Sequence, residues 1–118
     1  MKIRNSTFNL PSENDCFPSF SSSKYIDLTL GVSGSSYTAP ANGWVTFVKR
    51  TNRANQFVEL GIPNGIRFRD SEGESSSAAL TSLPVKKGDI FYITYTAGGT
   101  LTWFRFVYAE GEQSIIKY

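Results

Sequence analysis

At 118 residues the chain has the size of a single domain with one hydrophobic core, and no apolar run is long enough to insert into a membrane. Its net charge of +2 comes from 12 basic and 10 acidic residues scattered along the sequence, which disfavours nucleic acid as a partner. Aromatic residues make up 14% of the chain and charged residues only 19%, a balance that favours strands over helices.

The N-terminal residues, 1–23, are rich in serine, asparagine and proline and show neither strand nor helix periodicity. They lack the apolar run of a signal peptide, so we expect no secretory signal. We interpret them as an extended N-terminal arm that precedes a β-sandwich head domain at 24–118. The arm carries Phe8, Phe17 and Phe20, which we expect to lie on this domain or on a neighbouring subunit.

The head domain begins with two predicted strands and a turn between them. Residues 24–30 alternate between apolar and polar side chains, as a half-buried strand does. Pro40 and the pair Asn42 and Gly43 then predict a turn in which Asn-Gly supplies a positive φ. Residues 43–49 follow as a strand with apolar side chains on both faces.

A second pair of strands follows the polar segment "RTNRAN". Residues 56–62 and 66–70 have strand character and are joined by the Pro-Asn-Gly turn at 63–65. Within the second of these strands, Arg67 and Arg69 are predicted to face opposite to their apolar neighbours.

The remainder of the chain continues this pattern of strands and turns. Its segments are a loop at 71–77, a short strand at 78–83, a turn at 84–89, long apolar strands at 90–96 and 101–109, a tight hairpin at Gly98 and Gly99 between them, and a last short strand at 113–118. About eight strands without a capped helical segment predict an all-β fold, an antiparallel β-sandwich or barrel. We expect the two long strands to lie at its centre.

The side chains that most enzymes and metal sites require are missing. Hydrolysis by a Ser-His-Asp or Cys-His arrangement needs an imidazole, and the chain has no histidine. One cysteine, Cys16, cannot complete a zinc site, and we interpret it as a buried, unreactive thiol. The acidic run at 70–74 lacks the ligand order of a calcium loop and is interpreted as a solvated loop. We therefore expect no enzymatic activity, no metal and no cofactor.

Aromatic residues are more numerous than one small core usually holds. Trp44, Tyr92, Tyr95, Trp103 and Tyr108 belong to predicted strands. The strand predicted at 101–109 carries bulky side chains on both faces, as is typical of a strand buried within a sandwich or across a subunit interface. For each aromatic residue we favour the core or an oligomer interface over a ligand platform.

Three motifs of the head domain carry a resemblance to a known family. "YTAPANGWVTF" (37–47), "LPVKKGDIFYITY" (83–95) and "FRFVYAEG" (104–111) are turn and strand signatures. Together they resemble the C-terminal head domains of bacteriophage tail fibres and related receptor-binding proteins, which are similar to the trimeric jelly rolls of the complement globular-head and tumour-necrosis-factor type. In that pattern, APANG launches a core strand and PVKKGD launches the strand that pairs near it.

The resemblance implies a jelly-roll-like sandwich of about eight strands that assembles as a homotrimer. It also implies a non-enzymatic adhesin, a phage or prophage tail-fibre tip that binds a bacterial surface polysaccharide or outer-membrane protein and contacts other tail-fibre components. Such a protein is part of the virion or is released from the host cell by lysis. The alternatives are a carbohydrate-binding module with an aromatic platform and a purely structural fibre protein.

Polar loops on a rigid sheet are the surfaces on which we expect ligand contact, because arginine and asparagine suit sugar hydroxyls and acidic glycans. The candidates lie in two predicted loops, "RTNRAN" and "RDSEGE", and one of the alternatives adds an aromatic residue. The candidate ligand-binding residues are Arg50, Asn52, Arg53, Asn55, Arg69, Asp70, Glu72 and Trp103.

Overall fold

The structure is a computed structural model, and it describes residues 24–109. These residues form eight β-strands and no helix, and so contain no helix that could cross a membrane. The strands are β1 (Tyr25–Asp27), β2 (Ser36–Thr38), β3 (Gly43–Arg50), β4 (Gln56–Gly61), β5 (Arg67–Glu72), β6 (Ala78–Val85), β7 (Ile90–Tyr95) and β8 (Thr100–Tyr108). The arm at 1–23, Cys16 and the strand expected at 113–118 lie outside the described residues.

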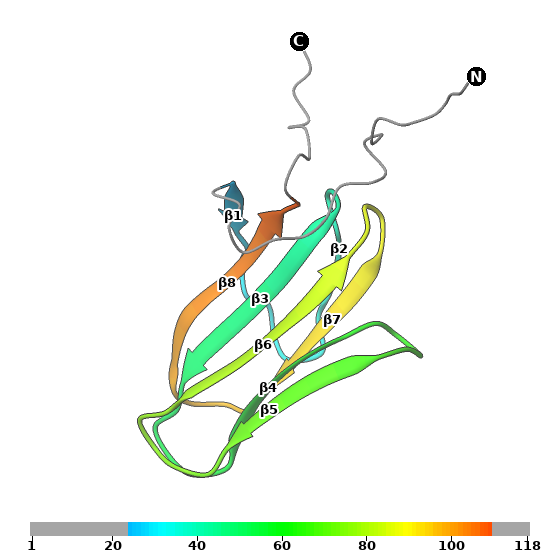
Figure 1. The fold of residues 1–118 in the computed structure, drawn as a ribbon. Coiled ribbons are helices and arrows are strands. Elements are labelled where there is room, and N and C mark those ends of the chain that lie inside the picture. Colours follow the sequence, from blue (N-terminus) through cyan, green and yellow to red (C-terminus); the bar gives the residue numbers. More distant parts are fainter. Residues whose placement is uncertain (1–23, 110–118) are drawn as a thin grey trace, which may run out of the picture.

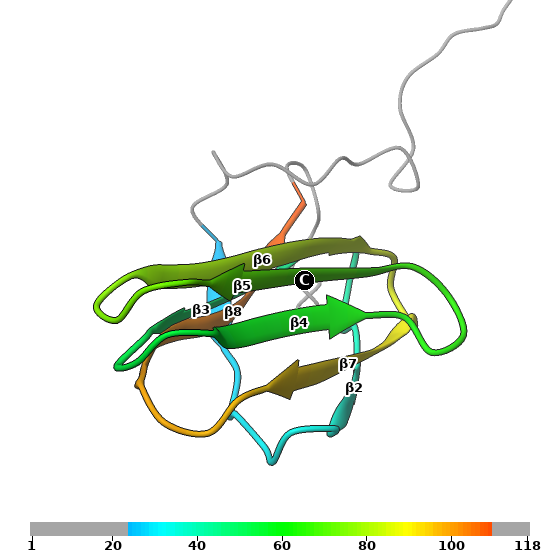
Figure 2. The same ribbon diagram turned by 90° about the horizontal axis from the view of Figure 1, so that it is seen from below.

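Two four-stranded antiparallel sheets pack face to face (Figure 2). The strand order is β1-β8-β3-β6 in the first, which we call sheet I, and β2-β7-β4-β5 in the second, which we call sheet II. Apart from the β4–β5 hairpin, each strand is followed in the chain by a strand of the other sheet. This order is that of an eight-stranded jelly roll, so the all-β sandwich prediction is confirmed. The strands β7 and β8 are inner strands of their sheets, as expected, although β7, with six residues, is shorter than β3 and β6, with eight each.

The core is filled by the alternate side chains that face the space between the sheets. From sheet I come Val45, Phe47, Phe104 and Phe106, and from sheet II come Val58, Leu60, Phe91 and Ile93, all at most 1% exposed. Tyr37 stacks on Phe91 with 5.5 Å between ring centroids and meets Phe104 edge-on at 5.2 Å. The aromatic excess of the sequence is thus partly explained by the core.

Several strand boundaries differ from the prediction, two of them at the edges of sheet I. β1 ends at Asp27, although residues 24–30 alternate, because the chain separates from β8 after this point. The last backbone hydrogen bond between the two segments runs from Leu28 N to Phe104 O at 2.8 Å. At the other edge of sheet I, β6 continues through Pro84, which was expected to begin a turn. Proline is tolerated there because an edge strand does not need every backbone N–H for pairing.

The Asn42-Gly43 turn has a different basis from the one predicted. Neither residue has a positive φ, and Gly43 is the first residue of β3. Glycine is required there because a Cβ would lie 2.1 Å from the carbonyl oxygen of Val107. In the second turn of this kind the expected conformation is present, carried by Asn64 with φ 60°.

The prediction of a tight hairpin at Gly98 and Gly99 is also wrong. β7 belongs to sheet II and β8 to sheet I, so the loop between them crosses from one sheet to the other. Both glycines have a positive φ, 90° and 77°, which this crossing uses. Sequence distance between two strands does not determine whether they pair.

The two turns that carry the sequence resemblance lie side by side. Ala39 N donates to Asp89 O at 2.8 Å, and Lys87 N donates to Asn42 Oδ1 at 2.8 Å. The strands that follow them nevertheless belong to different sheets, since β3 pairs with β6 and β8, whereas β7 pairs with β2 and β4. The two motifs thus launch strands of opposite sheets, and β7 pairs near the first turn, with β2, which ends just before it.

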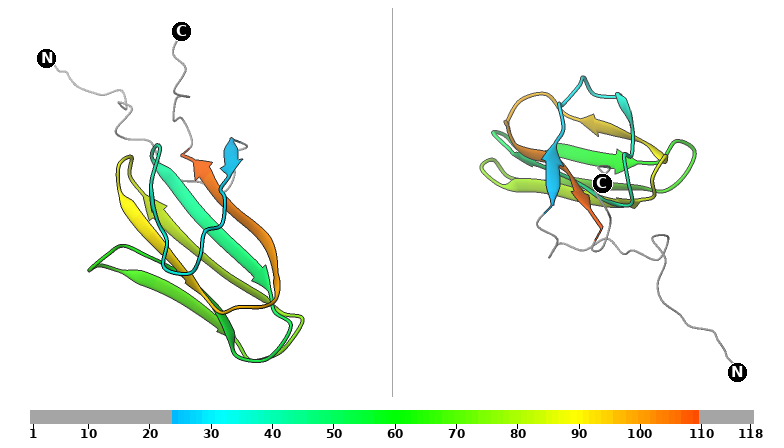
Figure 3. Two further views of the ribbon diagram at one scale, coloured as in Figure 1. Left: turned by 180° about the vertical axis from the view of Figure 1, so that it is seen from behind. Right: turned by 90° about the horizontal axis from the view of Figure 1, so that it is seen from above.

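The described chain enters and leaves at one end of the sandwich. Tyr108 N donates to Lys24 O at 2.9 Å, and β1 and β8 lie together in the view from above (Figure 3). The β3–β4, β5–β6 and β7–β8 loops gather at the opposite end, at the bottom of Figure 1. The fold thus separates an end that joins the rest of the chain from an end made of loops.

Candidate functional site

Backbone and side-chain hydrogen bonds join the β3–β4 and β5–β6 loops into one surface. Thr51 N donates to Ser77 O, and Ser76 N donates to Thr51 O, both at 2.8 Å. The buried hydroxyl of Thr51 also donates to Glu74 O at 2.8 Å. We call the surface formed by residues 50–56, 72–77 and 96–99 the loop end.

Gln56 connects this pair of loops to the third one. Its side chain is buried, its Oε1 accepts the backbone N–H of Asn52 at 2.8 Å, and its Nε2 donates to Ala97 O at 2.9 Å. A buried amide with donors and acceptors both used holds its partners in one arrangement. Gln56 therefore fixes the β3–β4 loop relative to the β7–β8 loop.

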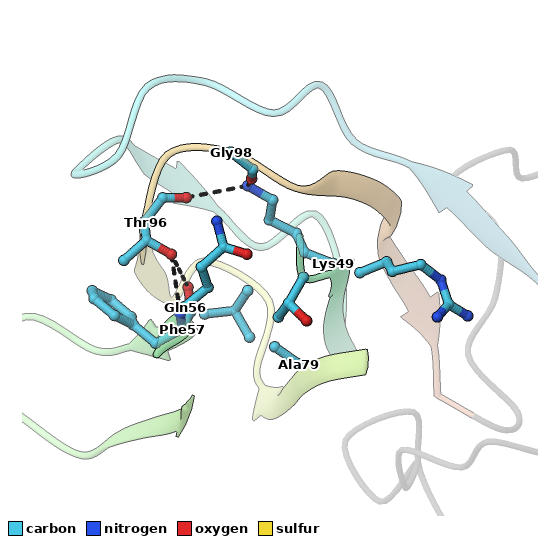
Figure 4. Close-up of a pocket in the computed structure, with 9 residues that line it drawn as sticks. Lys49, Gln56, Phe57, Ala79, Thr96 and Gly98 are labelled. Carbon is cyan, nitrogen blue, oxygen red and sulfur yellow. Dashed lines mark hydrogen bonds between the residues drawn. The ribbon is translucent and has the colours of Figure 1, made fainter. Parts of the chain in front are cut away.

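Lys49 is a buried cation beneath the β7–β8 loop (Figure 4). Its Nζ donates to Gly98 O at 2.8 Å and to Thr96 O at 3.2 Å, and it lies 4.7 Å from the centroid of the Tyr95 ring. Burial lowers the pKa of Lys49 from its ordinary value because the charged form loses hydration. The ammonium group holds the crossing loop from below.

Neither Lys49 nor Gln56 was among the candidates from the sequence. Strand alternation contained a signal for the lysine, because Lys49 shares a face with Val45 and Phe47 and must therefore point inward. A lysine at an inward position of a strand needs a specific polar environment. The same alternation applies to Gln56, which shares a face of its strand with Val58 and Leu60 and must also point inward.

Four of the predicted residues, Arg50, Asn52, Arg53 and Asn55, lie together at the loop end and are exposed. Arg50 Nη1 donates to Ser76 O at 2.9 Å. Asn52 Oδ1 and Arg53 Nη1 lie 3.2 Å and 3.3 Å from the position that a Cβ on Gly98 would occupy. The guanidinium of Arg53 is therefore close to the crossing loop, on a surface whose three loops are bonded to one another.

The other predicted loop is largely a strand. Arg69, Asp70 and Glu72 belong to β5, which runs to Glu72, and only the residues after it form the loop. Asp70 Oδ2 accepts the backbone N–H of Leu80 at 2.9 Å, which joins the edges of the two sheets. Arg69 lies on the outer face of sheet II, away from the core, since its pairing partner Glu59 alternates with Val58 and Leu60.

Glu72, the last residue of β5, is an acidic residue of the loop end. A hydrogen bond with the Asp70 carboxyl raises the pKa of Glu72, and repulsion by Asp70 and then Glu74 acts in the same direction. Its backbone oxygen accepts the N–H of Asn55 at 2.8 Å. Among residues 24–109, no three acidic, histidine or cysteine side chains gather in a way that could hold a metal ion.

Trp103 lies on the outer face of sheet I. The residue is 37% exposed, and its Nε1 donates to Thr46 Oγ1 at 3.3 Å. The guanidinium of Arg105 lies 4.9 Å from the Trp103 ring and 4.3 Å from the Tyr25 ring, and its Nε donates to Asp27 Oδ1 at 2.8 Å. The eight predicted residues are thus distributed over the loop end, the seam between β5 and β6, and the outer faces of both sheets.

The surface around Trp103 is largely apolar. Trp44 pairs with Pro84 and Val107, and Val48 pairs with Leu80 and Trp103, so these side chains share the outer face of sheet I. Leu80 is 55% exposed and Tyr25 is 47% exposed. We call the surface formed by Tyr25, Trp44, Thr46, Val48, Leu80, Pro84, Trp103, Arg105 and Val107 the apolar face.

Comparisons with protein-family models, with curated proteins and with solved structures gave no match. The functional assignment therefore depends on the surfaces of this fold and on the motifs of the sequence.

Proposed function

We propose that the chain is the head of a phage or prophage tail fibre, a non-enzymatic adhesin that binds a bacterial surface glycan or outer-membrane protein through the loop end. The observation that supports this most is the position of the loop end, opposite the end at which the chain enters and leaves. A head attached at one end to other tail-fibre components can present the opposite end to a cell surface.

The chemistry of the loop end fits this role. Exposed arginine and asparagine side chains supply donors for sugar hydroxyls and for anionic groups. Lys49, Gln56 and Thr51 bind the loops to one another, so little conformational entropy is lost when a ligand binds. The assignment to a phage particle, present in the virion or released by lysis, is supported by the turn and strand motifs of the sequence.

Self-association as a homotrimer belongs to the same proposal, and the apolar face supports it. Protein interfaces are enriched in tryptophan, tyrosine and arginine and depleted of lysine and carboxylates. The apolar face carries Trp44, Trp103, Tyr25 and Arg105, and the carboxylate beside it, Asp27, is bonded to Arg105. A closed trimer would bury this face and present three loop ends, which gives avidity for a repeated surface ligand.

Arg53→Ala is expected to weaken binding to bacterial cells about tenfold or more, since it removes an exposed guanidinium next to the crossing loop at the loop end. The measurement is binding of the labelled protein to whole cells of many strains. Lys87→Ala, which removes an exposed charge in the β6–β7 turn, is the matched control and should bind as the unaltered protein does.

The alternatives predict different results in the same assay. Loss of binding in a folded Trp103→Ala variant, with Arg53→Ala unaffected, would indicate a carbohydrate-binding module with an aromatic platform. The absence of binding to any strain would favour a purely structural fibre protein and contradict the adhesin.

Leu80→Lys is expected to convert the homotrimer to monomers, because it places three charges in a buried apolar interface. Light scattering after size exclusion should then give the chain mass of 13.1 kDa instead of three times that mass. The matched control is Ile90→Lys, since Ile90 is similarly exposed, at 51%, on the opposite sheet. A monomeric unaltered protein, or equal dissociation by both variants, would contradict the proposed interface.

A further inference from the structure

The outer face of sheet II carries a group of side chains that the loop end does not include. Strand pairing places Glu59 opposite Arg69, and Gly61 opposite Arg67 on one side and Tyr92 on the other. Directly paired residues share a face, and the core residues of β4 alternate with these. Arg67, Arg69 and Tyr92 therefore occupy one surface, which we call the arginine strip.

Two contacts fix the orientation of Arg69 within the strip. Its Nε donates to Glu59 Oε1 at 2.8 Å, and its guanidinium carbon lies 3.9 Å from the centroid of the Phe57 ring. The Glu59 side chain is only 5% exposed, whereas that of Arg69 is 50% exposed. Because Nε is bonded to Glu59, the N–H groups on the two Nη atoms are the donors that remain for a ligand.

Gly61 allows Tyr92 to reach Arg67. A Cβ on Gly61 would lie 2.6 Å from Tyr92 Oη and 2.8 Å from Arg67 Cβ, so the phenol end of the Tyr92 side chain lies over the glycine. A larger residue at this position would displace the ring. The absence of a side chain thus brings an aromatic ring and a phenol against the exposed Arg67.

The charges of this face leave a positive excess. Glu59 is paired with Arg69, which leaves the charge of Arg67 without a carboxylate partner on the outer faces of β4 and β5. The two arginines are two residues apart along one face, which separates them by about 7 Å. This spacing exceeds the size of one small anion, so an extended polyanion fits both arginines better than a free ion does.

We propose that the arginine strip is a second binding site, for the carboxylate groups of an acidic polysaccharide. Guanidinium groups bind carboxylates through two parallel hydrogen bonds, which lysine cannot reproduce. The Tyr92 ring offers an apolar surface for a sugar ring and a hydroxyl for its polar edge. The site does not depend on the ligand of the loop end, because the two surfaces share no residue.

The test is binding to immobilised polygalacturonate, with neutral dextran as the reference polymer. The unaltered protein should bind polygalacturonate and not dextran. Arg67→Ala should weaken this binding at least tenfold, and Arg67→Lys should restore little of it. Lys87→Ala removes the same charge elsewhere and should leave the affinity unchanged.

A second variant tests the geometry while both arginines are kept. Gly61→Ala should displace Tyr92 and lower the affinity for polygalacturonate, with a thermal melt of each variant to verify folding. Four results would overturn the proposal: no binding by the unaltered protein, equal binding to dextran, equal loss in Lys87→Ala, or tighter binding to a single-stranded oligonucleotide than to polygalacturonate.

Discussion

Phe106→Ala is expected to lower the free energy of unfolding by about 3–5 kcal/mol. Phe106 is 0% exposed, lies between Val45 and Ile26 in sheet I and meets Tyr108 edge-on at 5.0 Å between ring centroids. Its truncation leaves a cavity that the surrounding strands cannot close without breaking their pairing. Since a domain is stable by only about 5–15 kcal/mol, urea denaturation should show a large shift of the midpoint.

Phe68→Ala is the matched control for this prediction. Phe68 lies on β5, an edge strand, and is 43% exposed, so the same change of side chain should cost about 1 kcal/mol or less. If both substitutions lower the free energy of unfolding by the same amount, Phe106 does not occupy the centre of the core. Because the two variants lose identical atoms, their difference measures the environment alone.

Gly43→Ala is expected to cost about 3 kcal/mol or more, although alanine is ordinarily preferred to glycine within a strand. The added Cβ would lie 2.1 Å from Val107 O and 2.8 Å from Phe106 Cζ. The first of these atoms is backbone in the strand paired with β3, so relief requires the two central strands of sheet I to separate. Chemical denaturation measures the loss, and a changed near-ultraviolet circular dichroism spectrum would report altered aromatic packing.

The control for this steric effect is Gly73→Ala. No heavy atom lies within 4 Å of the position that a Cβ on Gly73 would take, and its φ is not positive. The stability of this variant should remain within about 0.5 kcal/mol of that of the unaltered protein. A similar, small effect at Gly43 would show that β3 and β8 are not as close as described.

Alternation of side chains was sufficient to predict most strands, because each strand has one face in the core. The same signal failed where pairing depends on distant segments. Residues 28–30 alternate as a strand does, yet the chain leaves β8 after Asp27. Likewise, Gly98 and Gly99 are typical hairpin residues, but the strands on either side of them, β7 and β8, belong to opposite sheets. Which strands pair is therefore determined by the packing of the whole core and not by the residues of one segment.

The candidate site was predictable in part for a similar reason. Polar composition identified Asn52 and Arg53 as exposed loop residues, as the structure shows. It also suggested a loop from Arg69 onward, whereas pairing of Gln56 with Glu72 continues β5 through polar residues. An edge strand tolerates such residues because only one of its sides is paired and much of it is exposed. The bonds from Lys49 to Gly98 and from Gln56 to Ala97 could not be predicted, since these partners lie 49 and 41 residues away in sequence.

The bond between Tyr108 N and Lys24 O, at 2.9 Å, has a consequence for how the sandwich can be combined with other polypeptides. A unit whose entry and exit are neighbours can be inserted in the place of a surface loop of a larger protein. Such a domain can be moved from one protein to another, duplicated or exchanged without separating the elements of the surrounding protein on either side of it. The residues at the far end are then free to diversify by substitution, insertion or recombination, while the connection to the host remains unchanged.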